Sequence, residues 1–132
     1  MAPDAVEAAK WFALAAAQGN PKAQYSLGVS YDLGKGLPQN DAEAFKCYRE
    51  AVRQGYAPAQ YKFGALYASG RGVEKSPAQA LRWYLRSAKQ GYAPAQHEVA
   101  GLYGSGQGVK QDLAEAARWY RRAAQQGHVP AQ

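Results

Sequence analysis

The sequence has a single cysteine, Cys47, so no intramolecular disulfide can form and cysteine usage does not reveal the redox compartment. It also has no apolar run near the roughly 20 residues that a membrane-spanning helix requires. The first residues are small and apolar, but Asp4, Glu7 and Lys10 interrupt them, unlike the clean apolar segment of a signal peptide. We therefore expect no transmembrane segment. Both a cytoplasmic and an exported parent protein agree with this sequence.

Catalytic and metal-binding motifs are lacking as well. The two histidines, His97 and His128, do not share a helix face at metal-ligand spacing. No GxSxG, HExxH or P-loop sequence occurs, and the GKG, GRG and GQG segments recur at a fixed period, as structural turns would. Cys47 occupies a repeat position that is otherwise tryptophan, which favours a packing role over a reactive thiol. We expect no catalytic site, no metal and no cofactor.

What the sequence does contain is a repeat. Shifting the 132-residue chain against itself by 36 residues aligns the copies without a gap. The clearest copy runs from Pro58 to Gly91, and in-phase positions include the glycines Gly19, Gly55, Gly91 and Gly127. A period in the range of 20–50 residues predicts a solenoid, in which each repeat packs only on its neighbours.

One half of the repeat predicts a well-capped helix. Each copy opens with a preferred N-cap residue that is followed three positions later by Glu or Gln, the capping-box pattern. The four pairs are Asp4 with Glu7, Asn40 with Glu43, Ser76 with Gln79, and Asp112 with Glu115. Apolar residues then recur at helical spacing up to the in-phase glycine that ends the helix. We predict these B helices at about residues 4–18, 40–54, 76–90 and 112–126.

The other half predicts a shorter A helix. It opens near Pro21, Pro58 or Pro94 and ends in a pair of glycines. Gly28 and Gly64 lie inside it, where glycine costs about 1 kcal/mol relative to alanine, so we expect a close helix–helix approach at both. The chain then forms one domain of about seven helices. Its units are a half repeat at 4–19, full repeats at about 20–55, 56–91 and 92–127, and the truncated start of another at 128–132.

The repeated positions resemble Sel1-like repeats, which are related to tetratricopeptide repeats. In one copy they read Ala59, Phe63, Gly64, Tyr67, Gly70, Gly72 and Val73. The resemblance covers about residues 4–130, with Cys47 in place of tryptophan and Ala100 in place of glycine as departures. It implies an all-α fold, a right-handed α/α superhelix of helix-turn-helix repeats. Proteins of this family act as adaptors for other proteins, mostly in bacteria and in eukaryotic signalling and quality control.

The resemblance further implies that the A helices line a concave groove, which we expect to bind a protein or peptide of unknown identity. The positions that the core does not use are Lys22, Tyr25, Val29, Asp32, Tyr61, Ala65, Ala68, Ser69, His97 and Gly101. The row Tyr25–Tyr61–His97 stands out because amphipathic rings are common interface anchors. The alternative interpretation is that these rings only cover neighbouring helices.

The B helices carry a basic ladder, and the net charge of the chain is +6. The ladder comprises Lys10, Lys46, Arg49, Arg82, Arg86, Arg118 and Arg122. One interpretation is electrostatic docking to nucleic acid, a membrane surface or an acidic protein. We favour the other interpretation, a solvated face with cations placed late in each helix. No aromatic residues interleave with these charges in the way a single-strand platform requires, so we expect no specific nucleic-acid recognition.

Two further expectations concern rarer activities and the ends of the chain. Some cysteine-rich Sel1-like proteins have β-lactamase or penicillin-binding activity, but one cysteine and the lack of a serine–lysine constellation make a hydrolase the less favoured class. The last helix pair has no following A helix, so we expect part of the region from Trp119 to Ala123 to be uncovered. Terminal helices without a cap also make end-to-end self-association possible.

Overall fold

The structure is a computed structural model, and it describes residues 4–106 and 109–125. These residues form seven α-helices of 13 residues each. In chain order the helices are α1 (Ala5–Ala17), α2 (Pro21–Leu33), α3 (Asp41–Arg53), α4 (Ala57–Ser69), α5 (Pro77–Lys89), α6 (Ala93–Ser105) and α7 (Leu113–Gln125). The predicted alternation of B and A helices is confirmed, with α1, α3, α5 and α7 as B helices.

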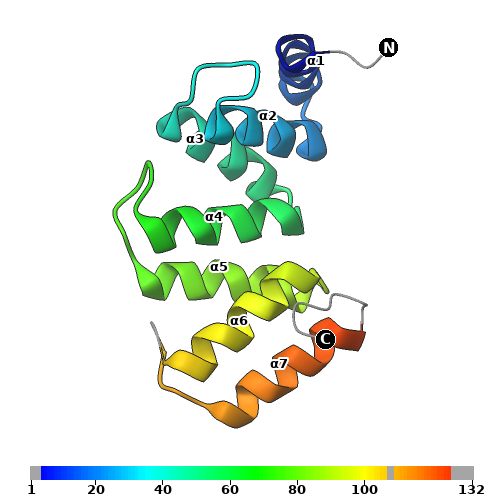
Figure 1. The fold of residues 1–132 in the computed structure, drawn as a ribbon. Helices are drawn as coiled ribbons and strands as arrows, with labels where there is room; N and C mark the ends of the chain where they lie inside the picture. The colour runs from blue at the N-terminus through cyan, green and yellow to red at the C-terminus, as the bar shows by residue number, and fades with distance from the viewer. Residues whose placement is uncertain (1–3, 107–108, 126–132) are drawn as a thin grey trace.

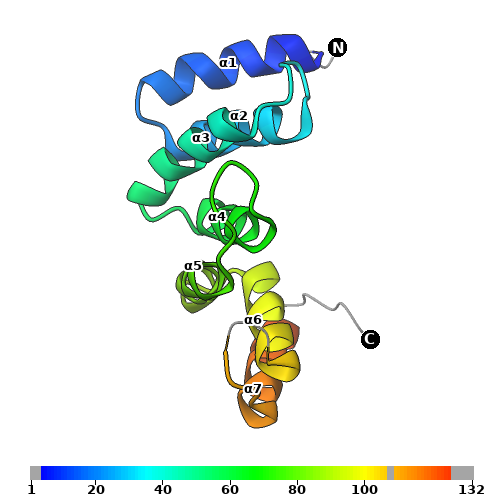
Figure 2. The ribbon, with the colours of Figure 1, turned by 90° about the vertical axis from the view of Figure 1, so that its left-hand side faces the viewer.

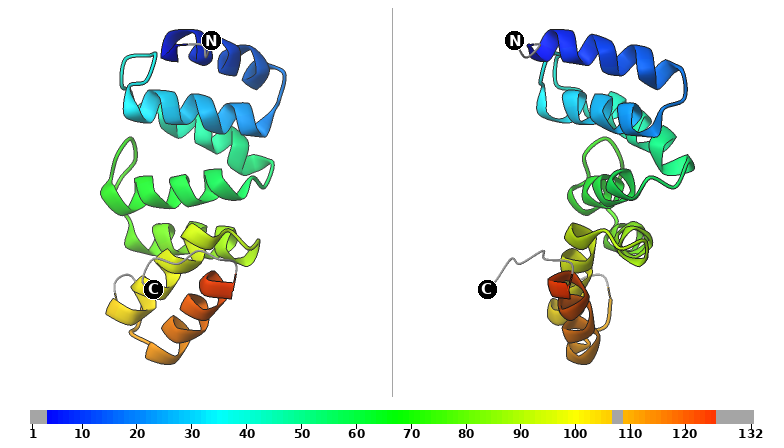
Figure 3. Two further views of the ribbon diagram at one scale, coloured as in Figure 1. Left: turned by 45° about the vertical axis from the view of Figure 1, so that its right-hand side comes forward. Right: turned by 90° about the vertical axis from the view of Figure 1, so that its right-hand side faces the viewer.

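The helices stack in chain order, with α1 and α7 at opposite ends (Figure 1). Helices α4 and α5 run across Figure 1 but point almost toward the viewer in Figure 2, whereas α1 does the reverse. The helix axes therefore turn along the stack, and the views in Figure 3 show the same progression. Each helix contacts its neighbours in the chain, which is the arrangement of an α-solenoid.

Repeated caps fix where the B helices begin and end. The Asp4 carboxylate accepts a hydrogen bond from the Glu7 N–H at 2.8 Å. The in-phase residues of the later B helices accept the same bond: Asn40, Ser76 and Asp112. Gly19 and Gly55 follow α1 and α3 with φ of 88° and 76°, a backbone region that glycine adopts without strain.

Each of the first two complete pairs is held close by a glycine that faces an aromatic ring. A Cβ atom added to Gly28 would lie 2.6 Å from the Tyr48 ring, and one on Gly64 would lie 2.9 Å from the Tyr84 ring. Both rings are buried. The predicted close approach is confirmed, because any side chain at these two positions would displace the ring. Tyr48 and Tyr84 belong to two successive core clusters that the repeats share.

The expectation that part of the region from Trp119 to Ala123 would be uncovered holds for Tyr120, which is 43% exposed, but not for the first and last residues of the region. Trp119 is only 6% exposed and Ala123 only 1%. Trp119 packs into the cluster that contains Val99 and Ala100 of α6, so it faces the A helix of its own pair and not the end of the array. Trp11 has the same repeat position on α1 but is 66% exposed, because no described helix lies on that side of α1. The predicted truncated start of another repeat, at residues 128–132, lies outside the described residues.

Candidate protein-binding surface on the A helices

Two tyrosine pairs repeat along the A helices. Tyr25 of α2 meets Tyr56, in the turn before α4, with ring centroids 5.6 Å apart and planes at 61°. Tyr61 of α4 meets Tyr92, in the turn before α6, at the same centroid distance and 64°. All four side chains are half-buried. The second pair therefore repeats the edge-to-face arrangement of the first, one repeat further along the chain.

The two pairs lie close enough to form one surface, here called the tyrosine patch (Tyr25, Tyr56, Tyr61 and Tyr92). Burial raises the pKa of Tyr25, and so do its neighbours Tyr92, Tyr56 and Tyr61. Burial raises the pKa of Tyr92 as well, with a contribution from Tyr56. Electrostatic effects of this kind fall off with distance, so the two pairs lie within electrostatic range of each other. Its polar edges are the four hydroxyls.

The predicted row Tyr25–Tyr61–His97 also rests on the B helices. The ring centroids lie 6.0 Å apart for Tyr25 and Tyr48, 5.6 Å for Tyr61 and Tyr84, and 5.3 Å for His97 and Tyr120. Each ring of the row thus packs on the B helix of its own pair, as the alternative interpretation held. All three nevertheless keep an accessible part.

Tyr56 and Tyr92 are not among the groove residues that the sequence predicted. The sequence does contain a pattern that could have identified them, because both tyrosines directly follow an in-phase glycine, Gly55 or Gly91. What the sequence does not show is that the turn brings Tyr56 against a ring 31 positions earlier, at Tyr25.

The other predicted groove residues differ in exposure. Lys22, Ala68 and Ser69 are exposed, and the Ser69 hydroxyl donates to the Ala65 carbonyl oxygen at 3.0 Å. The small or apolar members Val29, Ala65 and Gly101 are half-buried. These residues lie on the A helices and do not form a charged cluster.

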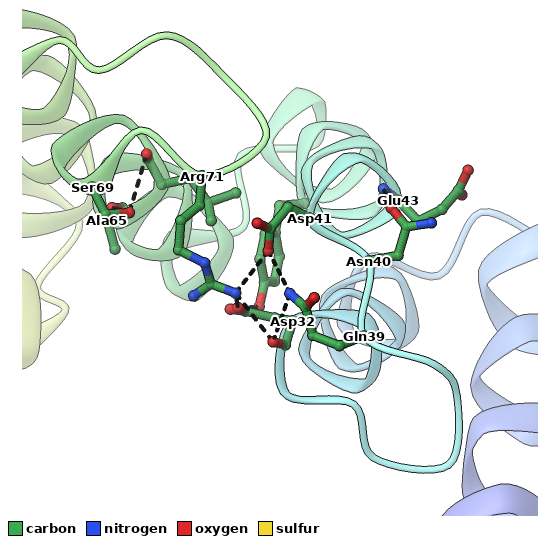
Figure 4. A network of polar contacts seen from close by, with 10 residues as sticks. Asp32, Gln39, Asn40, Asp41, Glu43, Ala65, Ser69 and Arg71 are labelled. Atoms are coloured by element: carbon green, nitrogen blue, oxygen red, sulfur yellow. Dashed lines mark hydrogen bonds and ion pairs between the residues drawn. The ribbon is translucent and has the colours of Figure 1, made fainter.

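Asp32 is the exception, because its side chain is only 8% exposed and lies in a network of polar contacts with Arg71 (Figure 4). The Tyr48 hydroxyl donates to its carboxylate at 3.0 Å. Arg71 reaches it from the loop after α4, with Nη2 at 2.7 Å, and also lies 2.8 Å from the Asp41 carboxylate. The hydrogen bond from Arg71 is the main reason that the pKa of Asp41 is lowered. Asp32 is therefore part of a link between repeats.

The predicted basic ladder is exposed at every position: Lys10, Lys46, Arg49, Arg82, Arg86, Arg118 and Arg122. Lys46 and Arg118 pair with acids three residues earlier on their own helices. Aromatic rings do lie beside the ladder, since the guanidinium of Arg86 lies 4.7 Å from the Trp83 ring centroid. Arg122 covers Trp119 in the same way at 4.6 Å. Because the arginines cover these faces, the rings are not open for base stacking.

Cys47 and the residue types that ligate metals are the groups considered for chemistry in the described ranges 4–106 and 109–125. Burial raises the pKa of the half-buried Cys47 thiol to about 11, with smaller contributions from Glu43 and Glu50, which disfavours a thiolate at neutral pH. Within the same ranges, no three His, Cys, Asp or Glu side chains gather as metal ligands. Nor is any of the described helices long and apolar enough to cross a bilayer.

The spacing of helices, caps and glycines matches a known family model. The Sel1 repeat model matches residues 1–20, 21–56, 57–92 and 93–128. The chain belongs to the Sel1 repeat family. No curated protein matches it.

Two similar crystal structures of Sel1-type proteins are each 39% identical to the chain. One is a protective antigen present in uropathogenic Escherichia coli strains, with a TM-score of 0.86 over 90% of this chain and 26% of that protein. The other is a Sel1 repeat protein from Oxalobacter formigenes, with a TM-score of 0.79 over 83% of this chain and 45% of that protein. The chain thus spans less than half the length of either relative.

A third structure, Helicobacter pylori cysteine rich protein B, has a TM-score of 0.73 over 92% of this chain and 86% of that protein. It is 16% identical, so the likeness concerns the fold alone.

Proposed function

We propose that this Sel1 repeat chain is a non-catalytic scaffold that binds a protein or peptide segment along its A helices, with the tyrosine patch as the anchor. The observation that carries the proposal is the repetition of the same tyrosine pair, Tyr25 with Tyr56 and Tyr61 with Tyr92, in two successive repeats. Tyrosine supplies a large apolar contact area together with a hydroxyl that donates or accepts a hydrogen bond.

The way the rings are held also suits binding. Edge-to-face contacts restrain Tyr25 against Tyr56 and Tyr61 against Tyr92 before any partner arrives. A partner therefore loses little of its binding free energy to ordering these side chains, a cost of about 0.5–1.5 kcal/mol for each flexible side chain that binding immobilises. Interface hot spots are rich in tyrosine for related reasons.

The proposal is tested with peptides selected from a displayed random library against the full chain. Tyr61→Ala should weaken the selected peptides by tenfold or more, as expected for the loss of a hot-spot ring at about 2 kcal/mol. Tyr61→Phe keeps the ring and should lose less. Leu113→Ala changes an exposed apolar residue of α7, outside the patch, and should leave affinity unchanged. Equal affinity for the Tyr61→Ala variant and the native chain would refute the patch as the anchor, provided circular dichroism shows the same helix content.

Electrostatic docking through the basic ladder is a weaker alternative, favoured by the exposure of all seven cations. Binding of this kind falls steeply with added salt, because it depends on counterion release and unscreened charge. A titration with single-stranded oligonucleotides and with anionic vesicles at low and at 0.15 M salt separates it from peptide binding. The double variant Arg82→Glu/Arg86→Glu should abolish ladder binding and leave the selected peptides bound.

The non-catalytic part of the proposal has a direct test. A chromogenic β-lactam should be hydrolysed no faster with the chain than with buffer. Turnover that survives purification and is lost in a single point variant would contradict the scaffold proposal, and a search for its nucleophile would then begin among the serines and Cys47.

We also propose that α1 supports self-association, with a second copy covering the side that carries Trp11 and Leu14. Both are exposed and lie three residues apart, so they share one side of the helix. Sedimentation velocity should show a concentration-dependent dimer that Trp11→Glu abolishes. Ala13→Glu, on the opposite side of α1, is the matched control. A monomer at all concentrations would exclude this interaction.

A further inference from the structure

A cavity of about 410 Å³ opens between α4, α5 and α6. Its lining consists of Ala68, Lys75, Pro77, Ala80, Tyr84, Glu98 and Leu102. Subtracting one 36-residue period from four of these positions gives Asp32, Gln39, Asp41 and Tyr48. These residues form the polar network of Figure 4, so the cavity occupies the place that the preceding repeat fills with its own side chains.

One substitution in the cavity lining removes an acid that the preceding repeat has. In the preceding repeat the Asp32 carboxylate accepts a hydrogen bond from the Tyr48 hydroxyl and pairs with Arg71. Ala68 stands at the position of Asp32 and has no carboxylate to offer. The in-phase hydroxyl of Tyr84 forms no hydrogen bond with the rest of the described chain, although its ring is buried like that of Tyr48.

The charge at the cavity is also reversed between repeats. Glu98 stands at the position of Lys62, so an acid replaces a base. Among residues 4–106 and 109–125, Glu98 makes no ion pair. Glu98 contributes, after burial, to raising the pKa of both Tyr84 and Tyr61, which places its carboxylate near both rings. The centroids of those two rings are 5.6 Å apart.

We propose that this cavity binds a lysine or arginine side chain of the partner segment, with Glu98 as the ion-pair partner. A carboxylate beside aromatic rings favours a cation, because the ring faces add cation–π attraction to the ion pair. The Tyr84 hydroxyl oxygen accepts a hydrogen bond from the bound N–H group. Ala68, Ala80 and Leu102 offer an apolar wall for the methylene stem, as long basic side chains require.

The other charged group of the lining is Lys75, which is exposed and forms no ion pair within the described residues. An acidic ligand would select Lys75 and the Tyr84 hydroxyl instead of Glu98. Removing the charge of Glu98 should therefore weaken binding of a basic ligand but not of an acidic one. The experiment below uses this difference.

The inference rests on the proposed function, since Tyr61 belongs both to the tyrosine patch and to the surroundings of Glu98. Its test uses small probes that do not need the patch: acetyl-lysine amide, acetyl-arginine amide, the uncharged acetyl-norleucine amide and acetyl-glutamate amide. Each is titrated into the full chain while amide and tyrosine NMR shifts are followed. The two basic probes should shift signals of Tyr84 and Glu98 and bind about tenfold more tightly than norleucine or glutamate.

Three variants sharpen the result. Glu98→Gln keeps the size of the side chain and should reduce binding of the basic probes about tenfold. Ala68→Leu, at an exposed position, should block the cavity without changing its charge. Glu74→Gln removes an exposed acid outside the cavity and should have no effect. Tighter binding of acetyl-glutamate amide, or unchanged binding of the basic probes by the Glu98→Gln variant, would overturn the proposal.

Failure here remains distinct from failure of the scaffold proposal. If Tyr61→Ala abolishes peptide binding while the Glu98→Gln variant binds the basic probes as tightly as the native chain does, only the cation-site proposal is wrong. If the basic probes bind through Glu98 but no selected peptide depends on Tyr61, the cation site is supported and the tyrosine patch is refuted as the anchor.

Discussion

Arg71 contacts Asp32 across the boundary between two repeats, with Nη2 of the guanidinium 2.7 Å from Oδ1 of the carboxylate. The arginine lies in the loop after α4, whereas the aspartate lies on α2, 39 positions earlier in the chain. At the position of Asp32 the next repeat has Ala68, which has no carboxylate for such a contact. Repeats that share one backbone thus differ in the side chain that they place at this position.

Replacing Arg71 should destabilise the stack. Arg71→Ala leaves the buried Asp32 carboxylate with the Tyr48 hydroxyl as its remaining side-chain partner, and an under-satisfied buried charge costs about 1–3 kcal/mol or more. Because Arg71 is half-exposed, solvent weakens its ion pair, and we expect a loss of unfolding free energy in the lower part of that range. Lys35→Ala is the matched control, because Lys35 has the repeat position of Arg71 but forms no ion pair in the described chain. Urea unfolding followed by circular dichroism measures both; equal midpoints for the two variants would contradict the role of the link.

Adding one methyl group should have opposite effects at two glycines. Gly28→Ala gains about 1 kcal/mol of helix propensity but forces a Cβ to within 2.6 Å of the Tyr48 ring, so a net loss of about 1–2 kcal/mol is expected. At Gly101 the nearest atom to an added Cβ is the Tyr120 hydroxyl oxygen at 3.8 Å, an ordinary contact. Gly101→Ala should therefore stabilise the chain by up to about 1 kcal/mol. Thermal unfolding shows whether each variant is more or less stable than the native chain. Stabilisation by Gly28→Ala would show that the Tyr48 ring moves aside without cost.

Periodic residues allowed the fold to be predicted, whereas contacts specific to one repeat were not predictable. Caps such as Asn40 and end signals such as Gly55 act within a few residues of themselves, so their spacing sets the helices directly. The position of Asp32 looked like a surface position because its in-phase residue is Ala68. Its burial depends on Arg71, a contact that only the register of stacked repeats brings together.

The same limit applied to the candidate site. Tyr25 and Tyr61 were found because they share one phase, but their turn partners Tyr56 and Tyr92 belong to another phase, and nothing in the spacing shows that the two rows meet. The cavity near Glu98 was missed for a related reason, since an absent side chain at Ala68 gives no signal until the filled site of the preceding repeat is seen.

Stability should fall at alkaline pH because folding raises the pKa of several tyrosines. Burial raises the pKa of Tyr84 well above the ordinary value near 10, so the folded state keeps a proton that the unfolded state releases. The contribution is complete below pH 10 and is lost as the pH rises above it. Tyr84→Phe should leave stability near neutral pH within about 0.5 kcal/mol, since its hydroxyl has no hydrogen-bond partner within the described residues, and should flatten the decline between pH 10 and 11.

The measurement is the urea midpoint from pH 7 to pH 11, together with tyrosinate absorbance. Tyr103→Phe serves as a comparison, because the part-exposed Tyr103 is less buried than Tyr84. An identical alkaline slope for Tyr84→Phe and the native chain would show that Tyr84 ionises normally.

Two tryptophans at the same repeat position should respond very differently to truncation. Trp119 is 6% exposed and packs into the α6–α7 core, so Trp119→Ala should cost about 3–5 kcal/mol through lost burial and the cavity left behind. Trp11 is 66% exposed on α1, and Trp11→Ala should change the free energy of unfolding by less than about 0.5 kcal/mol. The comparison keeps residue type and repeat position constant, so the difference reports only whether an A helix covers the ring. Chemical unfolding at a concentration where the chain is monomeric gives both values. A large loss for Trp11→Ala would mean that the exposed side of α1 is covered in solution, and repeating the measurement at several concentrations would show whether a second copy covers it.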